Sequence, residues 1–208
     1  MDFDAIREKL AALAEREWPE NWGAREQGET TDFYGWSHHY RMEPTASEHQ
    51  VAAFEQAHGV TLPEDYRKFL IELGNGGAGP GYGIFPLGEG EEEQLPQELL
   101  QNLSTDFSLI DTWNESRLAV GRGDNDSIPD EDYYSCSVIA GAIEIATDGC
   151  ALFYLLVVSG PGKGQIWFDK RADGEGVVPV RDERGAILTF GPWYQRWLDD
   201  AFRRWTGG

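Results

Sequence analysis

The sequence predicts an α+β fold: a single domain in which helices pack around a mixed, mostly antiparallel β-sheet. Three observations lead to this prediction. Helical patterns dominate the first 75 residues, β-prone runs dominate residues 138–178, and a helical pattern closes the chain. Helices that come first and strands that follow favour α+β over an alternating α/β fold. No internal repeat or long linker divides the chain, so we expect one domain over residues 1–208.

Three helices are expected in the first half. Apolar residues three and four positions apart predict a helix over residues 3–13, before Pro19. Ser47 and Gln50 form a capping-box pattern that opens a second helix, which Gly59 should end. The third begins at residues 62–65, where a proline and two acids suit the positive end of a helix, and runs to residue 73.

Residues 20–44, after the first helix, are aromatic and polar without a clear period, and a short strand over residues 33–41 is the element we expect there. Residues 74–83 are dominated by Gly and Pro and should turn sharply before a strand at residues 84–85. The acidic stretch that follows should contain a helix over residues 96–103.

The second half reads as strands. The run over residues 152–158 is apolar throughout, as expected of a central strand covered on both faces. A Gly-rich hairpin should join it to the next strand. Aromatic and apolar residues at helical spacing after Pro192 predict a closing amphipathic helix. The other strands are expected at residues 138–139, 142–146, 165–168 and 177–178.

Charge restricts the function. The chain has 37 Asp and Glu against 17 Lys and Arg, a net charge of −20. Such a balance repels phosphate, so we expect no binding to nucleic acid or to anionic membranes, and it favours basic partners. The excess is concentrated: residues 86–135 hold 13 acids and two bases, a net charge of −11.

Features of a secreted or membrane protein are not expected. The first residues carry acids where a signal peptide needs a basic stretch, and no apolar run is long enough to span a bilayer. The sequence therefore predicts a cytoplasmic protein. Cys136 and Cys150 are too few for a disulfide framework and are expected to be reduced thiols.

The sequence does not match the common catalytic and metal-binding motifs. The Gly-rich segment 74–83 lacks the Lys of a phosphate-binding loop. A calcium loop starting at Asp124 would need a ligand and a glycine where Ile128 and Pro129 stand. The four His show no zinc spacing, and no nucleophile-elbow motif is present. We therefore expect no catalytic residue, no metal and no cofactor.

Several blocks of sequence resemble one known family. Leu62-Pro-Glu-Asp-Tyr-Arg-Lys-Phe-Leu70 is followed by the Gly-rich segment and Ile84-Phe-Pro-Leu87. Further blocks stand in the same order at residues 148–150, 154–161, 164–169 and 193–198. Over residues 45–205 the chain is similar to the SUKH superfamily, which includes the Smi/Knr-like regulators of fungal cell-wall synthesis; residues 1–44 are an N-terminal extension.

The resemblance implies a single α+β domain that binds another protein and has no known catalytic residues. Many bacterial members are thought to be immunity proteins that neutralise toxins, often nucleases, and others act as regulatory scaffolds. The acidic region 88–135 departs from a minimal member. An inhibitor of a nuclease must compete for a cationic groove, which a concentrated acidic surface can do by complementarity and fast association.

The leading hypothesis is an immunity protein that binds a basic toxin domain through this acidic region. A regulatory scaffold remains open, as does a small-molecule or sugar-binding protein or enzyme with a cleft near Tyr82 and Trp167. A solvated loop explains any single acid equally well. The candidate partner-binding residues are Glu91, Glu92, Glu93, Asp124, Asp126, Asp130, Glu131 and Asp132, with Tyr133 or Tyr134 as aromatic anchors.

Overall fold

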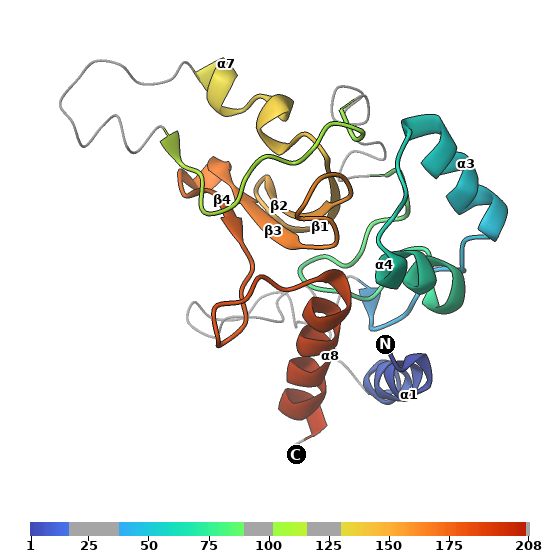
Figure 1. Cartoon of the computed structure of the whole chain (residues 1–208). Helices are drawn as coiled ribbons and strands as arrows, with labels where there is room; N and C mark the ends of the chain where they lie inside the picture. The colour runs from blue at the N-terminus through green and yellow to red at the C-terminus, as the bar shows by residue number, and fades with distance from the viewer. Residues whose placement is uncertain (17–37, 90–101, 116–129, 207–208) are drawn as a thin grey trace.

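A computed structural model describes residues 1–16, 38–89, 102–115 and 130–206 (Figure 1). The fold is α+β, with a four-stranded antiparallel sheet between two layers. Helices α1, α4 and α8 lie on one side of the sheet, and the segment 102–115 lies with α7 on the other (Figure 1). None of the helices in the described ranges is long and apolar enough to cross a membrane.

The first two expected helices are confirmed. Helix α1 (Phe3–Ala14) buries its predicted apolar face, and the Asp2 side chain caps it. Helix α3 (Glu48–His58) opens with the predicted capping box of Ser47 and Gln50. It ends at Gly59, whose φ of 65° is left-handed.

The third expected helix changes type half-way. Helix α4 (Glu64–Lys68) continues into a π-helix, η2 (Phe69–Leu73), in which the Gly74 amide donates to the Phe69 carbonyl at 3.0 Å. Phe69, Leu70 and Leu73 of this segment are all buried. Apolar spacing predicts the helix and its end but does not reveal this change.

The strands expected in the second half of the chain are confirmed with one exception. Strands β1 (Ala142–Gly149), β2 (Leu152–Val157), β3 (Ile166–Lys170) and β4 (Gly176–Pro179) pair in that order. The strand predicted at residues 138–139 is wrong, because Cys136–Ile139 form a 3₁₀-helix, η3. The Ser135 side chain accepts from the Ser137 amide there and offers the backbone a turn in place of a ladder.

Single bridges extend the sheet at both edges. Beyond β1, Ile84 pairs with Ala146, Gly77 pairs with Ile84, and Met42 pairs with Gly77. The strand expected at residues 84–85 is thus reduced to one residue, Ile84, which bridges to both Ala146 and Gly77. Beyond β4, Trp113 pairs with Val177.

Two predicted elements lie mostly outside the described residues. Of the strand predicted over residues 33–41, only residues 38–41 are described, and they form a turn. Of the helix predicted over residues 96–103, only residues 102 and 103 are described.

Both faces of the sheet are covered. On one face Trp167 of β3 packs edge-on against Phe107, with ring centroids 5.1 Å apart. On the other, Tyr154 of β2 packs against Trp193 of α8 (Phe190–Thr206) at 5.2 Å. Helix α1 packs in turn on α8 and η2. The predicted closing helix therefore supplies part of the core.

Candidate partner-binding surface

A buried ion pair ties the acidic region to the sheet. The Arg171 guanidinium grips Asp169 through two nitrogens, with Nη2 at 2.6 Å from Oδ2 and Nε at 2.9 Å from Oδ1. Its Nη1 donates to the carbonyls of Tyr133 and Ser135 at 2.9 and 3.0 Å. Both charged side chains are nearly inaccessible. One side of the guanidinium binds the carboxylate of Asp169 in β3, and another binds two carbonyls at the end of α7 (Asp130–Tyr133) and just after it. Arg171 therefore holds this segment against β3.

The structure separates the two tyrosines proposed as anchors. Tyr133 is 4% exposed, stacks on Trp113 and donates its hydroxyl to Asn114 Oδ1 at 3.0 Å. Tyr133 is therefore part of the packing and has almost no surface to offer a partner. Tyr134 is 51% exposed, and its hydroxyl donates to the Arg171 carbonyl at 3.2 Å.

Three exposed acids lie close along the chain to Tyr134 or to segments that meet near it. Asp132 precedes it by two residues, and Asp173 lies two residues after Arg171, whose carbonyl Tyr134 contacts. Glu115 follows Asn114, whose amide donates to the Gly174 carbonyl at 2.9 Å. None of the three makes an ion pair with another residue in the described ranges. We call Glu115, Asp132, Tyr134 and Asp173 the acidic face; it lies on the β4 side of the sheet (Figure 1).

The other predicted acids are placed less fully. Asp130 and Glu131 belong to α7, whose backbone is described there. Glu91, Glu92, Glu93, Asp124 and Asp126 lie outside the described residues. Asp173 and Glu115 were missed by sequence reasoning. Asp173 is about forty residues after the acidic run, and only the pairing of Trp113 with β4 shows that these segments meet.

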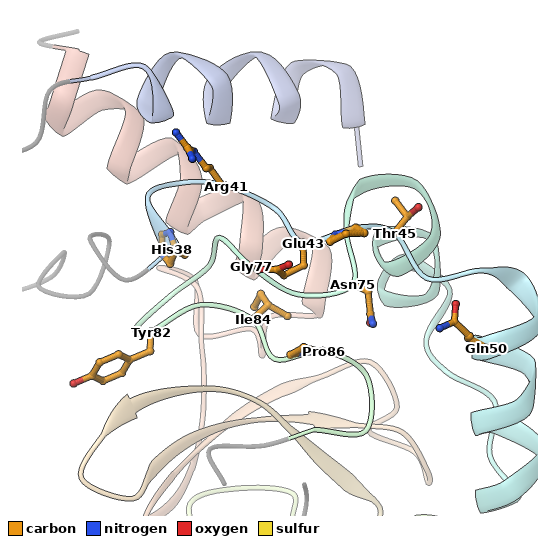
Figure 2. A pocket seen from close by; sticks show the side chains of 11 residues that line it. His38, Arg41, Glu43, Thr45, Gln50, Asn75, Gly77, Tyr82, Ile84 and Pro86 are labelled. Carbon is orange, nitrogen blue, oxygen red and sulfur yellow. The ribbon is translucent and has the colours of Figure 1, made fainter. Parts of the chain in front are cut away.

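A polar groove lies at the opposite edge of the sheet, with a volume of about 650 Å³. The segment 38–45, the Gly-rich loop and the start of α3 form its walls (Figure 2). Tyr82 stands at one end and Gln50 at the other, with Asn75 between them (Figure 2). The side chains that define it are His38, Arg41, Glu43, Gln50, Asn75 and Tyr82.

The groove differs from the predicted cleft in one residue. Tyr82 lines it and is 42% exposed. Trp167 is fully buried and packs against Phe107, so it lines no cleft. The alternation of side chains along β3 turns Trp167 to the face that the segment 102–115 covers.

His38 forms a fixed, neutral end wall of the groove. Its Nδ1 accepts from the Tyr40 amide and its Nε2 lies 3.0 Å from the Gly79 carbonyl. A backbone amide can only donate and a carbonyl can only accept, so the proton resides on Nε2. Burial lowers the pKa of His38 to about 4, and the hydrogen bond to Gly79 opposes this shift. With both nitrogens engaged, His38 is not placed to act as a base.

No group of three or more His, Cys, Asp or Glu in the described ranges could hold a metal ion. Cys136 is half-buried and Cys150 is exposed, and both are free thiols.

Comparison with known families decides the relationship. A model of the SMI1 / KNR4 family (SUKH-1) matches residues 45–183, about two thirds of the chain. The chain belongs to the SUKH-1 family. No curated protein and no solved structure matches it. In this SUKH-1 protein the match includes α3, the Gly-rich loop, α7 and the whole sheet, so the groove is within the family domain apart from its His38 to Pro44 wall. The acidic face is wholly inside the matched range.

Proposed function

We propose that this SUKH-1 protein is a cytoplasmic immunity protein that binds and neutralises a basic toxin domain, without enzymatic activity of its own. The observation that carries the proposal is the acidic face. It combines a half-exposed tyrosine with three exposed acids, and two of these acids belong to the stretch 86–135 that holds 13 acids and two bases. Family membership supports protein binding, since SUKH proteins are often immunity proteins.

The physical argument is complementarity. A toxin that cleaves nucleic acid presents a cationic groove, and an acidic surface steers it into contact at rates that fall with ionic strength. Tyr134 supplies an aromatic contact of the kind that dominates interface energies. The buried pair of Arg171 and Asp169 holds this tyrosine in place, so little ordering has to occur on binding.

The test compares two sets of charge changes. One variant carries Glu115→Gln, Asp132→Asn and Asp173→Asn; the control carries three equivalent changes at exposed acids far from α7, at Asp4, Glu8 and Glu72. Association with the basic protein that the tagged wild type captures from its source is measured by stopped flow at several salt concentrations. The acidic-face variant should associate about tenfold more slowly at low salt, with a flatter salt dependence.

The control variant should retain the association rate of the wild type within about twofold. Equal slowing in both variants would show that only the net charge matters, and no slowing in either would remove the acidic face as the binding surface. Tyr134→Ala, measured in parallel, should raise the dissociation rate more than it lowers the association rate.

A further inference from the structure

The groove at the β1 edge is a second site, independent of the acidic face. Its polar groups are oriented by contacts within the protein. The Asn75 Oδ1 accepts from the Leu87 amide at 2.9 Å, and the Gln50 Oε1 accepts from the Ser47 amide at 2.9 Å. A backbone amide can only donate, so the atom facing it must be the amide oxygen. Both NH₂ groups are therefore turned away from these partners.

Neither NH₂ group has a hydrogen-bond partner within the described part of the chain. Gln50 and Asn75 both line the groove, on its α3 side (Figure 2). The carboxylate of Glu43 also lines it and forms no ion pair with a described residue. The groove thus offers two fixed neutral donors and one exposed acceptor.

Tyr82 adds an aromatic surface at the far end. Its amide donates to the Thr147 carbonyl at 2.9 Å, which fixes the backbone against β1. Its ring lies on Gly149: a Cβ at that position would stand 2.9 Å from the ring atom Cε2. A ring supported in this way and 42% exposed loses little freedom when a ligand packs on it.

These features select one ligand class. Among the described lining residues the formal charges of Arg41 and Glu43 cancel, and His38 is held neutral, which disfavours phosphates and other strongly charged ligands. The apolar lining comes from two prolines and Ile84, which is 3% exposed, so the groove lacks a deep pocket for a peptide side chain. Hydroxyl groups both donate and accept, which matches the amides together with the carboxylate.

We infer that this groove binds a neutral, linear oligosaccharide, with sugar hydroxyls on Glu43, Asn75 and Gln50 and one sugar ring packed on Tyr82. The elongated arrangement from Tyr82 to Gln50 fits a chain of sugars better than a single one (Figure 2). We assign binding and not cleavage to the groove, because glycoside cleavage generally needs two carboxyl groups and the described lining residues supply one, that of Glu43.

The test uses three defined probes: maltotriose, cellotriose and N,N′,N″-triacetylchitotriose, each at about 10 mM, where a Kd in the millimolar range is detectable. Saturation-transfer NMR should show contact of at least one probe with the protein. Tyr82→Ala and Glu43→Gln should each weaken its binding about tenfold. Tyr134→Ala is the matched control, because Tyr134 is a similarly exposed tyrosine at the other edge of the sheet, and it should leave binding unchanged.

Glu43 is exposed, so Glu43→Gln should fold like the wild type even if Tyr82→Ala melts earlier. Absence of saturation transfer from all three probes would overturn the inference. Binding that survives both groove variants would overturn the location. Triglycine, measured as a fourth probe, would overturn the ligand class if it bound in the same place more tightly than the sugars.

Discussion

The two edges of the sheet are built by different means. Beyond β1 the sheet continues through backbone bridges at Ile84, Gly77 and Met42, and the resulting groove is neutral and lined by oriented amides. Beyond β4 one backbone bridge joins Trp113 to Val177, buried contacts of the Arg171 side chain hold α7 beside it, and the surface is acidic. One small sheet thus presents two chemically distinct surfaces, and we expect that each can be altered without the other.

The largest loss of stability is expected from adding a side chain to a glycine that packs closely against another backbone segment, and each edge of the sheet has one such glycine. A Cβ on Gly77 would lie 2.6 Å from the Arg41 carbonyl oxygen, and one on Gly176 would lie 1.9 Å from that of Trp113. Both glycines also have a positive φ. Alanine at either position should lower the free energy of unfolding by about 4 kcal/mol or prevent folding, as measured by chemical denaturation.

Gly185 separates the cost of the backbone conformation from the cost of the close approach, since its φ is also positive but no atom lies within 4 Å of its Cβ position. Gly185→Ala should cost only about 1 kcal/mol. An equal loss in all three variants would mean that backbone conformation, and not the close approach of the edge segments, sets the cost.

The next effect breaks the β4 edge alone. Arg171→Met should lower the free energy of unfolding by about 3–4 kcal/mol, because it leaves Asp169 buried without its partner. Adding Asp169→Asn should recover part of this loss, since the uncompensated charge is then gone. Arg181→Met removes an exposed pair with Asp111 and should cost under about 0.5 kcal/mol. Denaturation of the four proteins measures all of these values.

A contrary result would be an Arg171→Met protein as stable as the Arg181→Met one. It would mean that the carbonyls of Tyr133 and Ser135 and the Asp169 carboxylate find other partners, and that α7 is not held by this arginine.

The β1 edge should show a pH dependence through His38. The unfolded chain takes up a proton below a pKa of 6.5, whereas folded His38 resists protonation until about 4. Between these values the unfolded state binds more protons, so stability should fall as the pH is lowered from 6.5 to 4, by roughly 3 kcal/mol at most. Asp148, whose pKa burial raises, acts in the opposite direction.

His38→Gln isolates the contribution of His38, because Asp148 affects the stability of both proteins equally and its effect cancels when the two are compared. The difference in unfolding free energy between wild type and variant should change across pH 4 to 6.5 and stay constant above it. A difference that is flat over the whole range would show that His38 is not held neutral in the folded protein.

Much of the fold follows from local sequence, and the failures have physical reasons. The capping box at Ser47 and the apolar run in β2 are local signals, and both elements form where predicted. The bridges of Gly77 to Met42 and of Trp113 to Val177 join segments distant in sequence, so no local pattern signals them. The 3₁₀-helix at Cys136–Ile139 arises from a serine side chain that competes with the strand.

The candidate sites were predicted only in outline. Local acid density indicated Asp132, and an exposed tyrosine was expected at residue 133 or 134. Which of the two is exposed depends on Trp113, which stacks on Tyr133. Trp167 shows the same limit, because its burial is set by its strand face and by Phe107, sixty residues earlier. Composition finds the charge, but tertiary packing decides which side chains reach the surface.

The most direct test of the central claim is capture of the partner. The tagged wild-type protein and the Glu115→Gln, Asp132→Asn, Asp173→Asn variant are used in parallel to capture proteins from the source organism, expressed together with the gene's neighbours. Each is washed at low and then high salt, with mass spectrometry of what is retained. We expect the wild type to retain a stoichiometric basic protein at low salt and to lose part of it at high salt, and we expect the variant to retain less of it. A partner without net positive charge, retained equally by both proteins at both salt concentrations, would contradict it.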